Sequence, residues 1–151
     1  ENSRRSVAEQ LERQLGPEFI SKRPGQGGRK LSYVEGCQLI RIANKVFGYD
    51  GWNTSVRDVT VDFLDNVNGG LWNIGVTVKV RITLRGEGVD GAYREDLGYG
   101  VMDNARTKAQ ALEKAKKEAT TDAIKRCFRQ FGDVLGNCVY DKGYLEKIDR
   151  V

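Results

Sequence analysis

One stretch of the chain alternates strictly between apolar and polar residues. From Val76 to Leu84 every second residue is valine, isoleucine or leucine, and threonine, lysine or arginine stands between them. This period of two predicts a β-strand with one buried and one solvated face. A partly alternating run from Trp52 to Phe63 lies before it, beyond the turn residues Asn68 to Gly70, and a third extended stretch is expected from Ala92 to Tyr99. Short turns between consecutive strands predict an antiparallel meander.

Two short helices are expected before the strands. Ser6 to Glu9 and Ser32 to Glu35 both have the capping-box pattern, a serine followed three residues later by a glutamate, which predicts a helix that begins at each serine. The first helix is expected to stop at Gly16-Pro17, and the second, which carries one apolar stripe, at Gly48.

A longer helix is expected after the strands, from Arg106 to Phe131, and Gly132 is placed to end it. Because an amphipathic helix lays its apolar side on a sheet, the predicted fold class is α+β: an antiparallel β-meander packed on a long basic helix, with short flanking helices. The chain of 151 residues fits one domain, residues 1–151. The apolar side of the long helix consists of Leu112, Ala115, Ala119, Ala123, Ile124, Cys127, Phe128 and Phe131.

Positive charge is concentrated in two parts of the sequence, although the net charge is only +4. The long helix has eight basic residues and three acidic ones, and the Pro/Gly-containing loop from Ser21 to Lys30 has four basic residues and no acid. Charge sorted in this way favours a polyanion, of which nucleic acid is the commonest. A solvated helix face beside a mobile loop explains the charge alone equally well. The basic residues of the helix are Arg106, Lys108, Lys114, Lys116, Lys117, Lys125, Arg126 and Arg129.

Composition removes several classes of function. The chain has no histidine, so it lacks the usual general base and the Ser/His and Cys/His nucleophile pairs. Cys37, Cys127 and Cys138 are far apart and without CxxC spacing, which argues against a disulfide framework and a zinc site. There is no Walker-type phosphate loop, and nucleotide hydrolysis is therefore unsupported. We expect a protein that is not an enzyme and needs no cofactor or metal.

The sequence also limits location. No apolar run approaches the roughly 18 residues of a membrane span, and no segment resembles a secretory signal. The first residue is Glu1 rather than methionine. We expect a soluble, intracellular piece of a longer protein.

Three cations near the end of the long helix have the spacing of a phosphate-binding face. Lys125 and Arg129 are four residues apart, so they lie along one face with Arg126 beside them. The nearby Phe128 and Phe131 fall on the apolar side and are interpreted as core residues rather than as platforms for bases. This arrangement predicts contact with the phosphate backbone and little direct reading of bases.

Two alternatives remain at this point. A magnesium-dependent nuclease would need paired carboxylates near a basic groove, and the candidates are Asp62, Asp65, Glu95 and Asp96. Neighbouring residues on a strand point to opposite faces, so Glu95 and Asp96 are poor joint ligands, and surface carboxylates that balance charge are the favoured interpretation. Tyr33, directly after the basic loop, is either the edge of the core or part of a binding groove.

Five segments of the sequence, taken in order, form a recognisable series: residues 15–23, 33–36, 44–52, 93–100 and 131–138. Together they resemble the amino-terminal domain of one known family, the eukaryotic Rad-fifty-two family of single-strand annealing and recombination-mediator proteins. The resemblance covers nearly the whole chain. It implies a domain that assembles into a homo-oligomeric ring, with single-stranded DNA held by its phosphates in a basic groove on the outside of the ring and the bases facing out.

The resemblance also implies which residues bind DNA. The inner groove maps onto Arg23, Tyr33, Lys125, Arg126 and Arg129, and each position holds the expected residue type. A second, outer track maps more loosely onto Arg106, Lys114, Lys117 and Lys142. In the outer region a family lysine falls near Gly69 or Gly70, and Glu146 replaces a basic residue.

The predicted function is therefore single-stranded DNA binding and ATP-independent annealing in homologous recombination and double-strand break repair, in the nucleus. The expected partners are single-stranded DNA, with double-stranded DNA as a further candidate, and other copies of the chain. A recombinase and the replication single-strand-binding protein are expected to bind through regions outside this chain. The first alternative is a passive single-strand DNA- or RNA-binding module, and the metal-dependent nuclease is the rival from another class of function, which the sequence favours less.

Overall fold

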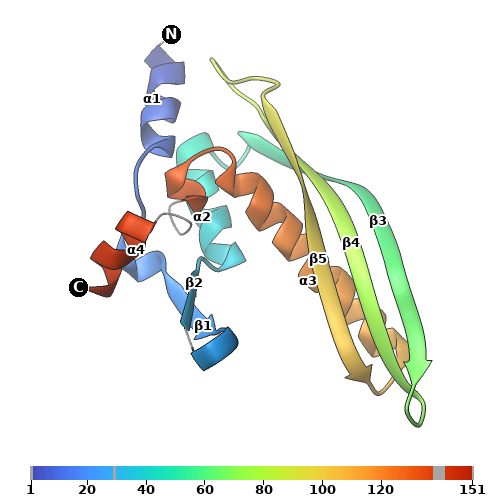
Figure 1. Ribbon diagram of the computed structural model, residues 1–151. Helices are drawn as coiled ribbons and strands as arrows, with labels where there is room; N and C mark the ends of the chain where they lie inside the picture. The colour runs from blue at the N-terminus through green and yellow to red at the C-terminus, as the bar shows by residue number, and fades with distance from the viewer. Residues whose placement is uncertain (1, 29, 138–141, 151) are drawn as a thin grey trace. The chain divides into compact units, whose positions relative to one another are not determined.

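The computed structural model describes residues 2–28, 30–137 and 142–150. The predicted α+β class with antiparallel sheets is confirmed: the chain forms a two-stranded sheet, a three-stranded sheet and several helices (Figure 1). In chain order the elements are α1 (Asn2–Leu11), η1 (Pro17–Phe19), β1 (Ser21–Pro24), η2 (Gln26–Gly28), β2 (Lys30–Tyr33), α2 (Gly36–Phe47), β3 (Trp52–Val67), β4 (Leu71–Leu84), β5 (Tyr93–Ala105), α3 (Lys108–Arg129), η3 (Asp133–Leu135) and α4 (Lys142–Asp149).

The chain divides into two compact units. The first contains Glu1–Asn53, Thr83–Ala92 and Phe128–Val151, and the second contains Thr54–Ile82 and Tyr93–Cys127. Among the described residues, no helix is both long enough and apolar enough to cross a membrane.

The second unit is built on the meander β3-β4-β5, whose strands are neighbours in sequence order (Figure 1). The alternation in β4 is confirmed, because its apolar residues from Ile74 to Leu84 are at most 3% exposed while Lys79 on the other face is exposed. Strand β5 runs on to Ala105, six residues past the expected end, since the glycines at its centre make room for α3 and do not break the strand. The buried apolar side chains of β4 are Ile74, Val76, Val78, Val80, Ile82 and Leu84.

Small residues allow α3 to approach β5 closely. A Cβ atom added to Gly98 would overlap the backbone of Ala119 and Ala123, and one added to Gly100 would overlap the backbone of Ala115. These alanines recur every four residues along α3 and are completely buried. The contact of glycine with alanine therefore brings helix and strand backbones together with no side chain between them.

Two helix starts in the first unit differ from the sequence-based expectation. Helix α1 begins at Asn2, and Ser6 lies inside it, where its hydroxyl accepts a hydrogen bond from Gln10 Nε2 at 3.4 Å. Helix α2 begins at Gly36 after the N-cap residue Glu35, and Ser32 is part of β2 instead. Both capping-box predictions were wrong. At Ser32 the reason is that the residue pairs with Lys22 in a β-hairpin, and this pairing replaces the local capping pattern.

The core of the first unit contains a group of aromatic rings. The Trp52 ring meets Phe128 edge to face at 5.2 Å, and Phe47 meets Phe131 in the same way at 5.8 Å. Trp52 Nε1 donates a hydrogen bond to Asn44 Oδ1 at 2.7 Å. Phe128 is completely buried, which confirms its interpretation as a core residue.

Candidate nucleic-acid interface

The basic loop of the first unit is a β-hairpin with a two-sided distribution of cations. Strands β1 and β2 pair antiparallel, with Ser21 opposite Tyr33, Arg23 opposite Leu31 and Pro24 opposite Lys30. Because paired residues point to the same face and neighbours along a strand to opposite faces, Arg23 and Tyr33 share one face of the hairpin.

Arg23 and Tyr33 are in contact on that face. The guanidinium carbon of Arg23 lies 5.7 Å from the centre of the Tyr33 ring, within the range of a cation–π interaction. Arg23 is exposed and Tyr33 is half-buried. The Tyr33 ring thus contacts one face of the Arg23 guanidinium, and the N–H donors of the guanidinium remain accessible to an anion.

In the second unit, Arg126 is held by two partners. Its Nε donates to Asp122 Oδ2 at 3.0 Å, and its guanidinium lies 5.6 Å from the Tyr99 ring. Asp122 Oδ2 also accepts the backbone N–H of Tyr99 at 3.0 Å. Since β5 is an edge strand, Asp122 both pairs an edge N–H and orients Arg126. Sequence reasoning missed Asp122 and Tyr99, although the four-residue spacing from Asp122 to Arg126 was a signal for the ion pair.

Three of the predicted inner-groove residues lie on α3. Lys125, Arg126 and Arg129 are all half-buried and lie within the final turns of α3. Of the five predicted residues, Arg23, Tyr33 and Arg129 belong to the first unit, and Lys125 and Arg126 to the second. Their assembly into one groove stays a prediction.

The structure describes the side chains of three of the four predicted outer-track residues. Arg106 is exposed and lies before α3, and Lys114 and Lys117 are exposed on α3. Lys142 begins α4, and its side chain lies outside those that the structure describes. Lys108, the first residue of α3 and two residues after Arg106, has its Nζ 5.7 Å from the centre of the Trp72 ring.

Two of the four carboxylates of the nuclease alternative, Glu95 and Asp62, have partners within the sheet. Glu95 accepts from Arg81 at 2.6 Å and lies 3.5 Å from Lys79, and the hydrogen bond from Arg81 lowers the pKa of Glu95. Asp62 Oδ2 accepts from the Thr77 hydroxyl at 2.5 Å.

No group of three or more His, Cys, Asp or Glu residues that would suit a metal ion occurs in the part of the chain that the structure describes. The ion pairs of Glu95 with Arg81 and Lys79 support the interpretation of this carboxylate as one that balances charge across strands, and Asp62 forms a hydrogen bond across strands instead.

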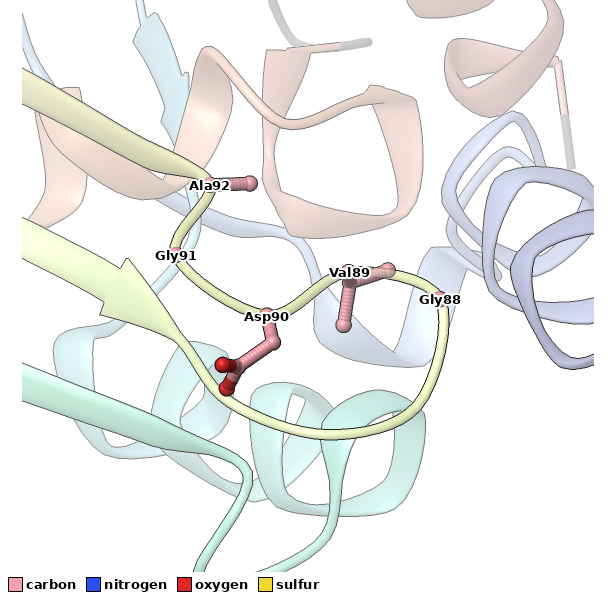
Figure 2. A pocket seen from close by; sticks show the side chains of 5 residues that line it. All are labelled: Gly88, Val89, Asp90, Gly91 and Ala92. Carbon is pink, nitrogen blue, oxygen red and sulfur yellow. The ribbon is translucent and has the colours of Figure 1, made fainter.

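A hollow of about 570 Å³ lies at the turn between β4 and β5 (Figure 2). Its lining is Gly88 to Ala92, and the Asp90 carboxylate is directed across the turn, where Oδ1 accepts the backbone N–H of Gly86 at 3.3 Å. Among the described residues that line the hollow, Asp90 is the charged one and it is negative, which does not suit a phosphate.

The chain is thus an α+β protein with exposed or half-exposed cations on a hairpin and along one long helix. It belongs to the Rad52/22 family of double-strand break repair proteins, whose sequence profile matches residues 3–151.

Fungal relatives are about half identical to it. The DNA repair and recombination protein RAD52 of Kluyveromyces lactis is 51% identical over 150 residues, which are 99% of this chain and 33% of the relative. RAD52 of Saccharomyces cerevisiae is 50% identical over 150 residues, 99% of this chain and 31% of the relative. The DNA repair and recombination protein rad22 of Schizosaccharomyces pombe is 51% identical over 142 residues, 93% of this chain and 29% of the relative. The chain therefore spans about a third of the length of these proteins.

Proposed function

We propose that this domain binds single-stranded DNA by its phosphates and anneals complementary strands without nucleotide hydrolysis, in homologous recombination and double-strand break repair in the nucleus. Family membership and the names of the relatives, which are DNA repair and recombination proteins, support the biological setting. One observation carries the binding mode: Lys125, Arg126 and Arg129 line the end of α3, while the aromatic Phe128 between them is completely buried.

The proposed inner groove contains Arg23, Tyr33, Lys125, Arg126 and Arg129. Each cation neutralises phosphate charge and releases condensed counterions, which favours binding of every sequence alike. Phe128 is buried and offers no platform on which bases could stack. The bases are proposed to face away from the protein and to remain free to pair. Pairing then supplies the specificity, at about 1.4 kcal/mol per base-pair step. The outer track, Arg106, Lys114, Lys117 and Lys142, is proposed as a weaker second path for DNA.

The domain is further proposed to assemble with copies of itself into a ring. Large apolar side chains on β3 and β5 support self-association, because they are 40–51% exposed and lie on the edge strands of the sheet. Contiguous exposed apolar surface and unpaired strand edges both favour contact with another chain. Contacts with a recombinase and with the replication single-strand-binding protein are proposed to involve regions outside this chain. The exposed residues are Val56, Val59, Val61, Phe63, Tyr93, Leu97, Tyr99 and Val101.

The test of DNA binding replaces Arg126. The Arg126→Ala variant is expected to bind labelled single strands of any sequence about tenfold more weakly, since it loses a charged contact of roughly 1.5 kcal/mol. The slope of log K against log salt should fall by about 0.7, the value for one phosphate contact on a single strand. Fluorescence anisotropy measures both. Lys45→Ala, an exposed cation on α2, is the matched control and should bind like the wild type.

The test of annealing mixes two complementary labelled oligonucleotides with the wild type in the absence of ATP and follows energy transfer. Faster pairing that declines with salt is the expected result. Binding without acceleration would reduce the function to a passive single-strand-binding module. Shortened strands in the presence of magnesium would favour the nuclease instead.

A further inference from the structure

One carboxylate lies among the cations at the end of α3. Asp122 is the only acidic residue from residue 119 to residue 131, a segment that contains three of the proposed phosphate-binding cations. Like charges repel, so a carboxylate beside a phosphate path is expected to weaken the binding of a polyanion. The contacts of Asp122 point to a compensating role.

Asp122 is held by the backbone of the neighbouring strand. Its Oδ2 accepts the backbone N–H of Tyr99 at 3.0 Å, and the same oxygen accepts a hydrogen bond from Arg126 Nε at 3.0 Å. Gly98 and Gly100, on either side of Tyr99, let β5 lie against α3 with no side chain between the two backbones. The carboxylate that holds Arg126 is therefore tied to α3 through its own chain and to β5 through a hydrogen bond.

These contacts restrict the orientation of the Arg126 guanidinium. One donor, Nε–H, is directed to Asp122, and the guanidinium carbon lies 5.6 Å from the centre of the Tyr99 ring. The Arg126 side chain is still 38% exposed, so part of it remains open to solvent and to an anion. An arginine that is already ordered loses less conformational entropy when it binds a phosphate than one that rotates freely.

We propose that Asp122 is a positioning residue for single-stranded DNA, and that its loss weakens DNA binding although it removes a negative charge. The inference rests on the proposed function, in which Arg126 contacts a phosphate. Two effects of Asp122 oppose each other. Its repulsion of phosphates is screened by salt, because its side chain is 34% exposed. The ordering of Arg126 acts through direct contacts, which salt screens much less, so at physiological ionic strength the ordering is the larger effect.

The experiment compares two neutralised carboxylates on the same helix. Asp122→Asn removes the charge at nearly constant size, and Glu118→Gln removes the charge of an exposed glutamate one turn earlier as the matched control. Both changes are also made in an Arg126→Ala background. Each protein is titrated with a labelled oligothymidine strand by fluorescence anisotropy at several salt concentrations, and its folding is checked by urea denaturation.

Asp122→Asn is expected to bind about fivefold more weakly at every salt concentration, the usual cost of ordering one long side chain. Glu118→Gln should bind like the wild type or up to about twofold more tightly, and this gain should vanish at high salt. In the Arg126→Ala background, Asp122→Asn should cause no further loss, because no guanidinium remains to be positioned. A purely structural role of Asp122 would weaken binding by the same factor in both backgrounds.

A second variant tests positioning with Asp122 intact. Arg126→Lys keeps the positive charge but replaces the planar guanidinium and its fixed set of donors with a flexible ammonium group. Positioning predicts that this variant binds at least about threefold more weakly than the wild type. Charge alone predicts that it binds equally well.

The inference is overturned if Asp122→Asn binds as tightly as the wild type or more tightly, if its loss is the same without Arg126, or if Arg126→Lys binds like the wild type. It is also overturned if Arg126→Ala binds like the wild type, because Asp122 then has no phosphate contact to position. In each of these cases a wild type that binds leaves the proposed function standing. A wild type that does not bind single strands would remove the proposed function and this inference together.

Discussion

Cys127 is a completely buried thiol in the second unit. Its Sγ donates to the carbonyl oxygen of Val80 at 3.2 Å. Burial raises the pKa of Cys127 to about 11, and the negative charge of Asp96 acts in the same direction. Cys37 is exposed and lies near a Glu35 carboxylate oxygen, at 3.6 Å. The two thiols are therefore expected to differ strongly in reactivity, since the thiolate is the reactive form.

Alkylation of the folded domain at pH 8.5 should modify Cys37 and leave Cys127 intact, as read by peptide mass spectrometry. In denaturant both residues should react. A folded-state rate at Cys127 equal to that at Cys37 would contradict the burial.

The raised pKa of Cys127 also sets the direction of a pH effect. A thiol in the unfolded state has a pKa of about 8.5. At a pH between this value and the folded-state pKa, the unfolded chain loses the thiol proton of Cys127 and the folded chain keeps it. The stabilising contribution is therefore complete below about pH 8.5 and is lost as the pH rises through the folded-state pKa of about 11. In urea unfolding the wild type should lose more stability over this pH range than Cys127→Ala, because the tyrosines and lysines that also titrate there are common to both proteins.

At the level of elements, the fit of β5 against α3 depends on having no side chain at two positions. Gly98 and Gly100 face the backbone of α3, and both are buried. The buried alanines of α3 complete the same contact. Any Cβ atom at these glycines must push the helix from the strand, and close-packed interiors resist such movement.

Gly100→Val should destabilise the domain by about 1–3 kcal/mol, the usual cost of overpacking. The reason is that the new side chain would collide with the backbone of α3. Urea denaturation measures the change. Asp103→Thr places a branched side chain at an exposed position of the same strand and should change stability by no more than about 0.5 kcal/mol. Equal effects of the two substitutions would mean that α3 does not depend on this close approach.

For the whole molecule, the exposed apolar residues of β3 and β5 are the feature that a lone chain does not explain. Val59 is 45% exposed and Val101 is 50% exposed, and each lies on an edge strand. Such surface is normally covered by a partner. The proposed covering partner is another copy of the chain.

Val59→Glu with Val101→Glu should therefore shift the domain from an oligomer toward the monomer in sedimentation velocity, because each carboxylate would have to lose water in an apolar contact. Asn66→Glu adds a charge at an exposed polar position of β3 and should leave the oligomer unchanged. A wild-type monomer, or a double variant that assembles like the wild type, would remove these strands from the proposed interface.

Local patterns in the sequence were sufficient for the features that depend on near neighbours. The alternation of β4, the turn at Asn68 to Gly70 and the burial of Phe128 follow from spacing and from residue type, because each is decided within a few residues or by one repeated period. The concentration of positive charge in the hairpin and in α3 is likewise a property of the sequence alone.

Tertiary structure decided the features that depend on residues far apart in the chain. Ser32 looked like a helix cap until pairing with Lys22 made it part of a strand, and the same pairing separated the hairpin cations into two faces. Asp122 and Tyr99, 23 residues apart, came together to hold Arg126. The physical reason is common to all three cases: hydrogen bonds and ring contacts between distant segments outweigh local preferences, and only the folded chain determines which segments meet.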